Sequence, residues 1–594
     1  MSQEEPTNGQ TQHAMLVAWG MYARQIGLIG AIEQVKVKQK TRDHSPNRKV
    51  LEFMVGILGG IKHLQDISHS AHPIDQDQTL ARAWGQESWA DYSGVSRTLS
   101  SLSQPESEAL VKGLQQVSQP FLDQEVLLCQ REQGCLIYDG DLTGRPISNS
   151  CESYPGAAYG YMGDQVQLGY QAAMVSMHSP SYGRQWLVVQ PHPGDKVACN
   201  QLQQMVLEAE QVSGVRPQRR LEYIAQSLEQ AEQAYQQCQL KWEQAATKLA
   251  QTQNKHQQVE QQCWHWQTET QRLEIAYCQA GRPERPHSAL AKARQKMAIY
   301  QKRLARLEQR LDQDKKRSQR LQIKYQHALR QWQDYQTHYL KCKADNAHHP
   351  NPVRIIFRLD AGFGTKENIA WLIEMGYEIY TKPYSHRLVN WLKNQVSAQA
   401  NWVSVGQNAQ MIAWTNKILN QHPYPLNVAV ARYQTGDTFR YTAFLHFGPD
   451  PVTADLPAWF QTYNARQTIE AGIKEGKGVF QMHHLKVRSP PALYLQEHFA
   501  AFAANFVRWA AGWLAQQPKP DLLPVVPQLR ADTPSVKHLV QVAAHASAQV
   551  FWHQDSCLIV FSDHSCYRGH ALLLSNLFYF QLPLPLFQVS DDFY

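Results

Sequence analysis

The sequence predicts an α/β protein in which a long antiparallel coiled coil, a β-rich insertion and a helical N-terminal domain accompany the main sheet. Helical patterning over about 14–130 changes after Gly134 to short apolar runs separated by Gly and Pro, which are typical of strands. Apolar residues then step by three and four positions along two long runs, as in a coiled coil. A strand–helix–strand order begins at Pro352, and this order favours a parallel pair of strands.

The N-terminal region consists mostly of helical patterns, and residues 49–67 have a broad apolar face. Residues 77–103 look like two short helices joined by a Gly-containing turn, with Ser93 or Ser96 as possible caps. This pattern fits a DNA-binding helix-turn-helix, but a plain helical packing domain explains it equally well.

Three strand candidates follow this region. The first, "CLIYDGDL" at 135–142, is a short apolar run that ends in Asp139 and Asp141. The next two cover 168–179 and 184–194, and a helix is expected over 200–212.

The segment from Arg219 to Lys343 differs in kind. Its two heptad runs flank the turn "AGRPERPHS", whose two prolines interrupt the helix, so an antiparallel hairpin is expected. Arms of about 55 to 60 residues would reach about 80 to 90 Å. The aromatic residues Trp332, Tyr335 and Tyr339 are expected to pack inside the hairpin.

The polar faces of the two arms are unequal, because only the second is rich in Lys and Arg. Its basic residues are Lys302, Arg303, Arg306, Arg310, Lys315, Lys316, Arg317, Arg320 and Lys324. Such a run is either a solvated face or a contact for nucleic acid. In the second case, charge reversal at Arg306, Arg310, Lys316 and Arg317 should weaken DNA binding and flatten its salt dependence.

The C-terminal half begins with a strand over 352–360, a helix and a second strand, followed by short strands within 400–450 around the turn "TGDT". Residues 495–517 form an apolar core helix. A Pro-rich connector, a helix near 535–549 and a strand over 555–563 complete the chain.

Bulk properties permit an anionic partner and argue against several classes of protein. The net charge is +7 and the pI about 8.7. The ten cysteines form no C-x-x-C pair, which argues against zinc and thioredoxin-like sites and favours reduced thiols. The N-terminus does not resemble a signal peptide, and no apolar run is long enough to span a membrane, so a cytoplasmic location is expected.

One stretch, 463–480, raises a specific question. Tyr463, Arg466, Glu470 and Lys477 are spaced by three, four and seven residues, which would align them on one face of a single amphipathic helix. A core stripe should be apolar, so this polar stripe is either a solvated face with ion pairs or a surface that meets something anionic.

Three carboxylates also stand out by their context. Asp141 and Asp360 each end a strand, and Glu470 lies on the polar stripe. Functional groups collect beyond the carboxyl ends of strands in open α/β sheets, and carboxylates suit Mg²⁺ or Mn²⁺. Two such ions could promote phosphoryl transfer. Asp139 is an alternative to Asp141, because both lie on the same side of an extended strand.

The order D…D…E, with Tyr463, Arg466, Glu470 and Lys477 as Y-x₂-R-x₃-E-x₆-K, resembles the DDE transposases of bacterial insertion sequences. More narrowly, it is similar to the YREK-signature group, which has an RNase H-like catalytic core. "DLT" at Asp141 and "RLDAGFG" around Asp360 look like the two aspartate regions of that group. The likeness covers most of the chain except the coiled-coil arms, which are longer than is usual in the group.

The resemblance implies a DDE triad of Asp141, Asp360 and Glu470 that binds Mg²⁺, for which Mn²⁺ could substitute. Asp141 is favoured over Asp139 because Thr143 completes the D-x-T pattern. Tyr463, Arg466 and Lys477 would hold DNA phosphates beside the triad.

The activity implied is binding of the terminal inverted repeats, cleavage at the ends and joining of the 3′ hydroxyl to target DNA. Double-stranded DNA would be the partner, a homodimer would form the synaptic complex, and hairpin intermediates are expected. A nuclease or resolvase without strand transfer, or a catalytically inactive DNA-binding protein, remains an alternative. The protein would associate with the nucleoid when bound to DNA.

The predicted organisation has a core interrupted by two insertions. Its parts are a helical, DNA-end-binding region at 1–130, core at 131–205, the coiled coil at 206–346, core at 347–398, a β-rich insertion at 399–455, core helices with the signature at 456–515 and a C-terminal region at 516–594.

Overall fold

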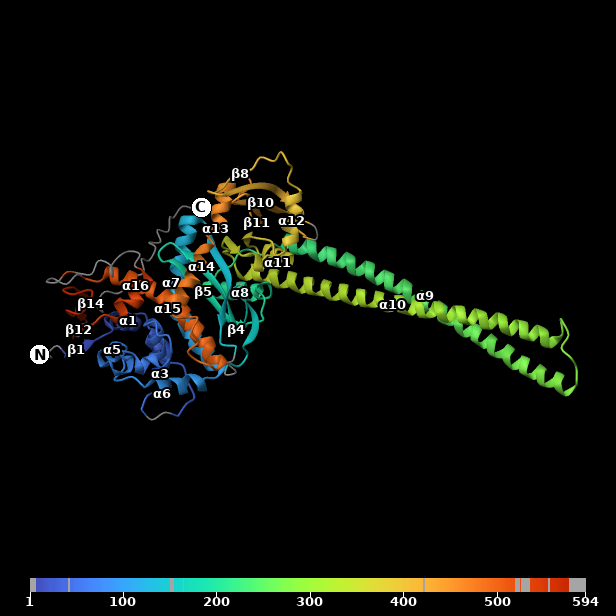
Figure 1. Cartoon of the computed structure of the whole chain (residues 1–594), viewed down its shortest axis with the longest axis horizontal. Coiled ribbons are helices and arrows are strands. Elements are labelled where there is room, and N and C mark those ends of the chain that lie inside the picture. The colour runs from blue at the N-terminus through green and yellow to red at the C-terminus, as the bar shows by residue number, and fades with distance from the viewer. Residues whose placement is uncertain are drawn as a thin grey trace, which may run out of the picture. The chain divides into compact units, whose positions relative to one another are not determined.

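The computed structural model describes residues 7–40, 43–149, 154–163, 165–419, 422–518, 524, 535–553 and 556–575. The protein is mixed α/β, as predicted, and divides into two compact units (Figure 1). Unit 1 comprises Met1–Gln218 and Asn351–Tyr594, and unit 2 is Arg219–Pro350.

A mixed sheet runs through unit 1, and its five central strands have the order β5-β4-β2-β6-β7. Their bounds are Leu136–Pro146 for β2, Gln165–Ser179 for β4, Gly183–Pro193 for β5, Ile355–Leu359 for β6 and Glu378–Thr381 for β7. β4 pairs antiparallel with both β2 and β5, whereas β6 is parallel to β2 and β7 is parallel to β6. The expected parallel pair, joined through α11 (Lys366–Glu374), is confirmed.

The strands predicted for a β-rich insertion lie in this same sheet. β11 (Thr438–Phe447) pairs antiparallel with β7, and β10 (Leu426–Thr435), β9 (Ala409–Lys417) and β8 (Val403–Ser404) follow outward. At the other end, β3 (Ala158–Met162) pairs with β4. The sequence of β3 did not suggest a strand.

The strand β2 does not end at its two aspartates, contrary to the prediction. It continues to Pro146 because β4 offers an antiparallel partner along its full length, with Asp141 opposite Met174. The parallel neighbour β6, however, ends at Leu359, opposite Gly140. Asp141 therefore lies where the parallel part of the sheet stops.

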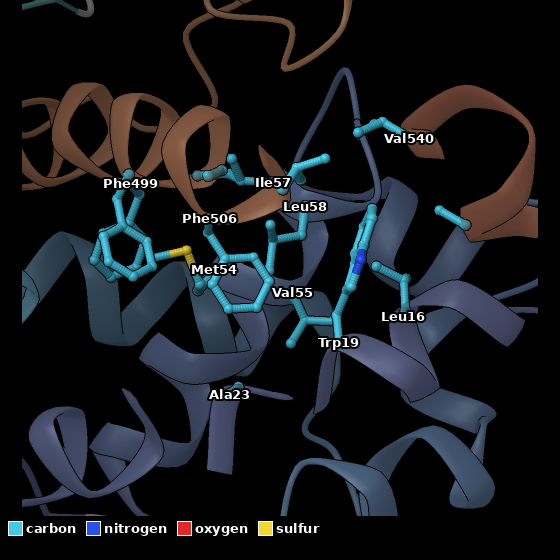
Figure 2. Close-up of a cluster of buried hydrophobic side chains, with 14 of the residues drawn as sticks. Leu16, Trp19, Ala23, Met54, Val55, Ile57, Leu58, Phe499, Phe506 and Val540 are labelled. Carbon is cyan, nitrogen blue, oxygen red and sulfur yellow. The ribbon is translucent and has the colours of Figure 1, made fainter. Parts of the chain in front are cut away.

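The core of unit 1 surrounds α15 (Pro490–Gln516), which is buried along most of its length, as the apolar pattern predicted. Figure 2 shows Phe506 of α15 with Trp19 of α1 (Ala14–Gln25) and Val55 of α3 (Pro46–Leu58). The rings of Trp19 and Phe506 meet edge to face at 6.4 Å. On the sheet side, the Asn505 side chain bonds to both backbone polar groups of Trp186 in β5, which ties the helix to the sheet.

The helix-turn-helix reading gains no support from the N-terminal helices. α5 (Gln78–Ala83) and α6 (Tyr92–Ser101) are separated by 84–91, which is longer than the three or four residues of that motif. α5 packs on α1, whereas α6 packs on α3. The cap of α6 is Asp91, which accepts from the Gly94 amide, instead of Ser93 or Ser96.

A second sheet joins the two ends of the described chain. β1 (Thr7–Thr11) pairs with β12 (Ala548–Trp552), followed by β13 (Ser556–Phe561) and β14 (Ala571–Ser575). The predicted helix near 535–549 is shorter, at Val536–Gln541 (α16). The Pro-rich connector falls largely outside the described residues.

The remaining helices of unit 1 range from 3₁₀ turns of three residues to α7 with 30 residues. They are α2 (Leu28–Glu33), α4 (Asp66–His69), η1 (Ile74–Gln76), α7 (Gln104–Gln133), α8 (Ala198–Ser213), η2 (Ala361–Phe363), α12 (His386–Asn394), α13 (Leu456–Asn464), α14 (Gln467–Gly478) and η4 (Ala543–His545).

Unit 2 is the predicted helical hairpin, with α9 (Leu221–Gln279) and α10 (Ala289–His348) side by side (Figure 1). The arms of 59 and 60 residues are each about 90 Å long at about 1.5 Å per residue. Inside the hairpin, Trp332 stacks on Tyr235 with ring centroids 5.2 Å apart, as expected of a seam residue. Among the described residues of both units, no helix is long and apolar enough to cross a membrane.

Candidate active site

The parallel register of β2 and β6 brings two of the predicted carboxylates together. Asp139 lies opposite Arg358, and Gly140 lies opposite Leu359. The next residue on each strand is Asp141 and Asp360, so these two aspartates are neighbours at the end of the parallel ladder. The hydroxyl of Thr381 in β7 donates a hydrogen bond to the backbone carbonyl of Asp360, which holds Asp360 beside β7.

The signature stretch forms two helices, so the prediction of a single helix over 463–480 is wrong. α13 ends at Asn464, α14 begins at Gln467, and Arg466 occupies the N-cap position of α14. Helical backbone angles persist at Ala465 and Arg466, which makes the break a tight turn. Arg466 and Glu470 nevertheless share one face, and their Nη2 and Oε1 atoms are 2.7 Å apart.

Arg466 stands among the three carboxylates. Its Nη1 lies 3.8 Å from Oδ2 of Asp141, and its Nη2 donates to Glu470. Its positive charge also opposes the rise in the pKa of Asp360. Asp141, Asp360 and Glu470 are therefore brought together from two strands and one helix.

Burial raises the pKa of both aspartates, and like charge adds to this rise at Asp141. Burial raises the pKa of Asp141 to about 6, with Arg466 opposing this shift and the charges of Asp360 and Glu470 adding to it. Burial also raises the pKa of Asp360. Within the described residues, Asp360 Oδ1 is buried and has no hydrogen-bond partner. A divalent cation would satisfy that oxygen and favour the charged forms of both aspartates.

Metal binding by Asp141, Asp360 and Glu470 together stays a prediction. Among the described residues, no three His, Cys, Asp or Glu side chains are arranged to hold an ion as they stand. Glu470 is paired with Arg466, and its side chain is 44 % exposed. Asp141 and Asp360 fit a divalent cation by donor type, proximity and the unpaired Oδ1 atom.

Asp139, the alternative first ligand, is engaged in a different contact. Both of its oxygens accept from Arg358, at 2.6 and 2.7 Å, and the Thr468 hydroxyl also donates to it. All the side-chain oxygens of Asp139 are thus occupied by a buried ion pair. This arrangement favours Asp141 as the residue open to a ligand.

We expect Arg358→Leu to lower the free energy of unfolding by about 3 to 5 kcal/mol, because Asp139 would remain buried without its counter-charge. The double variant Asp139→Leu/Arg358→Leu should recover part of this loss. Thermal unfolding of the full chain measures both. Removal of the exposed Lys316–Asp312 pair is the control and should change stability by less than about 1 kcal/mol. If Arg358→Leu changes stability no more than removal of the Lys316–Asp312 pair does, the buried-pair assignment is contradicted.

Tyr463 lies inside the protein, although it was predicted to line a DNA groove. It is 4 % exposed, and its ring meets Phe444 edge to face at 5.0 Å. Burial raises its pKa well above the ordinary range. The neighbouring Arg466 opposes this rise in pKa, so Tyr463 packs beside Arg466 inside the protein.

Lys477 is half-buried, and its charge interacts with that of Asp141. Burial lowers its pKa, and the neighbouring charge of Arg145 adds to this effect. Arg145 itself forms a buried pair with Glu497 of α15, with Nη2 and Oε2 3.0 Å apart. Because Arg145 shares a face of β2 with Asp141, this pair extends the polar surface along the strand.

Sequence reasoning missed Lys382, which directly follows β7. Its Nζ lies 5.1 Å from the centre of the Tyr463 ring and 5.4 Å from that of Phe444. Burial and the charge of Arg466 lower its pKa, while Asp360 and Glu470 oppose that shift. The only signal was its position directly after a parallel strand whose neighbour, β6, ends just before Asp360; the residue itself belongs to no motif.

Comparison of the chain with models of protein families gives no match. Comparison with curated proteins also finds none that is significantly similar.

Proposed function

We propose that this protein is a DDE transposase that cleaves the ends of an insertion sequence and joins them to target DNA by metal-dependent phosphoryl transfer. The observation that carries this proposal is the juxtaposition of Asp141 and Asp360 by the parallel register, with Arg466 and Glu470 beside them. These four residues belong to the D…D…E order and YREK signature of the resembling transposases.

The order of strands supports an RNase H-like core. Such a core has three antiparallel strands, followed by two strands that extend the sheet in parallel from the first. β2, β4 and β5 followed by β6 and β7 have this order, and the hairpin of unit 2 lies between the two groups in sequence.

Asp141, Asp360 and Glu470 would hold Mg²⁺, with Mn²⁺ as a possible substitute. The bound cations would promote attack of a water or 3′ hydroxyl on a phosphodiester and stabilise the departing oxygen. Arg466 would bind a phosphate oxygen, because its buried Nη1 donates no hydrogen bond to any described residue. Lys382, which interacts with Asp360 and Glu470, and Lys477, which interacts with Asp141, would add positive charge to the site.

Two other functions use the same residues. A nuclease or resolvase would cut without strand transfer, and an inactive DNA-binding protein would lack metal dependence. We favour the transposase because the signature residues Arg466 and Glu470 contact each other beside the aspartates. The partners would be double-stranded DNA and a second copy of the chain, in the cytoplasm.

The proposal is tested with DNA that flanks the coding region. Full-length protein, Mg²⁺ and a duplex carrying the flanking inverted repeat should give cleavage at the repeat end and, with target DNA, joined product. Scrambled end sequence serves as the control. Cutting without joining would favour the nuclease, and binding without cutting would favour the inactive protein.

The raised pKa of Asp141 should make metal binding depend on pH. Because its pKa is about 6, protons should compete with Mg²⁺ as the pH falls below that value. The Mg²⁺ concentration for half-maximal cleavage should therefore rise about tenfold from pH 7 to pH 5. Titrations of Mg²⁺ at several pH values measure this. A half-maximal concentration that does not change over this range would contradict a role for Asp141 as a ligand.

A further inference from the structure

A groove on the helical hairpin collects positive charge from both arms. It has a volume of about 1020 Å³ and is flanked by six cations, which are Lys241 and Lys248 of α9 and Lys316, Arg317, Arg320 and Lys324 of α10. No Asp or Glu lines it. The groove lies wholly within unit 2 and shares no residue with the candidate active site.

Most of this charge has no ion-pair partner among the residues that the structure describes. Lys248 pairs with Asp314 at 3.3 Å, and Lys316 pairs with Asp312 at 2.8 Å. Among the described residues, no carboxylate lies within ion-pair distance of Lys241, Arg317, Arg320 or Lys324. The groove therefore carries a positive charge that a ligand can neutralise.

The two arms hold these cations in a fixed register. Trp242 stacks on Tyr325 at 5.1 Å near one end of the groove, and Thr252 donates to the buried Asp314 near the other. A buried polar contact of this kind specifies how two helices align. The cations thus project from a rigid pair of helices, and little backbone order is lost when a ligand binds.

The shape and chemistry of the groove fit an extended polyanion. Lys241 and Lys248, like Arg317 and Lys324, are seven residues apart, which is about 10 Å along a helix. A single phosphate ion could not reach cations spread over that length. The groove is also lined by the apolar Ala245, Leu321 and the 67 % exposed Ile323, and by Gln244 and Gln313, whose amides can add hydrogen bonds to the contacts that the cations make.

We propose that this groove binds the phosphate backbone of duplex DNA without sequence preference. The choice of duplex DNA as the polyanion rests on the proposed function, whereas the cationic groove does not. Lys and Arg that neutralise phosphates release counterions, so such binding weakens steeply with salt. The hairpin would then add affinity for DNA beyond that of the active site, and the active site would keep the chemistry.

The structure separates the basic residues of the second arm into two sets. Of the four residues for which charge reversal was predicted to weaken binding, Lys316 and Arg317 line the groove, whereas Arg306 and Arg310 do not. A sharper test neutralises only groove cations that lack an ion pair. Glutamine suits this purpose, since it removes the charge and is as good a helix former.

The experiment compares two triple variants of the full-length chain, Arg317→Gln/Arg320→Gln/Lys324→Gln and the control Lys302→Gln/Arg303→Gln/Arg306→Gln. Both remove three positive charges from α10. Fluorescence anisotropy of a labelled duplex is recorded between about 50 and 200 mM salt. For the groove variant, the slope of log affinity against log salt should become shallower by about 2 to 3, because each lost phosphate contact contributes about 0.9. The control slope should stay close to that of the unaltered chain.

Equal changes of slope in both variants, or none in either, would overturn the proposal. Loss of binding to phosphatidylserine vesicles or single-stranded RNA in the groove variant, with an unaltered slope for duplex DNA, would also overturn it. The active site is tested separately with Asp360→Asn. If Asp360→Asn abolishes cleavage while the groove variant binds duplex DNA with an unaltered salt slope, the proposed function is supported and the groove proposal is not. If the groove variant has a shallower slope but the protein never cleaves DNA, the groove proposal is supported and the proposed function is not.

Discussion

Asp360→Asn should reduce Mg²⁺-dependent cleavage of the end duplex by about a thousandfold or more and leave DNA affinity almost unchanged. The substitution keeps the shape of the side chain but removes a charge that a divalent cation needs. A loss of several kcal/mol of metal-assisted charge stabilisation corresponds to about three powers of ten in rate. Affinity for DNA depends mainly on phosphate contacts, which this aspartate does not make. Glu470→Ala should have the same effect.

Cleavage and gel-shift assays on the same protein preparations separate these two effects. Asp437→Asn, in the exposed turn between β10 and β11, is the matched control and should cleave normally. Thermal unfolding establishes that each variant is folded. If cleavage by folded Asp360→Asn is as fast as that of the parent, Asp360 is not a metal ligand. If folded Asp360→Asn loses binding together with cleavage, the separation between the two roles is wrong.

Local periodicity predicted those parts of the fold whose buried face can be recognised from residues close together in sequence. The heptad stepping on both sides of "AGRPERPHS" predicted the hairpin, because each arm displays its own seam. The apolar α15 and the β6–α11–β7 unit were likewise apparent from short-range patterns. In each case, neighbouring residues determine which face is buried.

Pairings between distant segments could not be predicted in this way. The strand β1 pairs with β12 although more than 500 residues separate them, and nothing in the polar sequence of β1 indicates this. The continuation of β2 past Asp141 depends on β4, which provides hydrogen bonds to residues that look like a turn. The break at Ala465 was also hidden, since both residues at the turn keep helical backbone angles.

The candidate site combines both kinds of information. The residue types Asp141, Asp360 and Glu470 were recognised from the sequence, but their proximity depends on the parallel register of β2 and β6. The same register pairs Asp139 with Arg358 in an ion pair. It thereby separates the roles of Asp139 and Asp141, which their spacing in the sequence could not do. Lys382 was overlooked because one Lys after a short strand has no pattern of its own.

Removal of Arg466 should produce the second large effect, a fall in cleavage of about a thousandfold for Arg466→Gln, which keeps the side chain polar and of similar length. In phosphoryl transfer, an Arg that stabilises the transition-state charge contributes about 10³ to 10⁵ in rate. Arg466→Lys should restore little, because a guanidinium contacting Glu470 and facing Asp141 offers two groups of donors where an ammonium offers a single charged centre.

The dependence of cleavage on pH separates this electrostatic role from a structural one. The charge of Arg466 holds down the pKa of Asp141, which burial and neighbouring carboxylates raise to about 6. Without Arg466, the pKa of Asp141 should be higher still, so the acid limb of the pH–rate profile should move to higher pH. The exposed Lys474 lies on the same helix, and Lys474→Gln should leave both rate and profile unchanged. A slow but folded Arg466→Gln with an acid limb at the parental pH would show that Arg466 does not control the charge of Asp141. Its part in the site would then be limited to contacts with DNA.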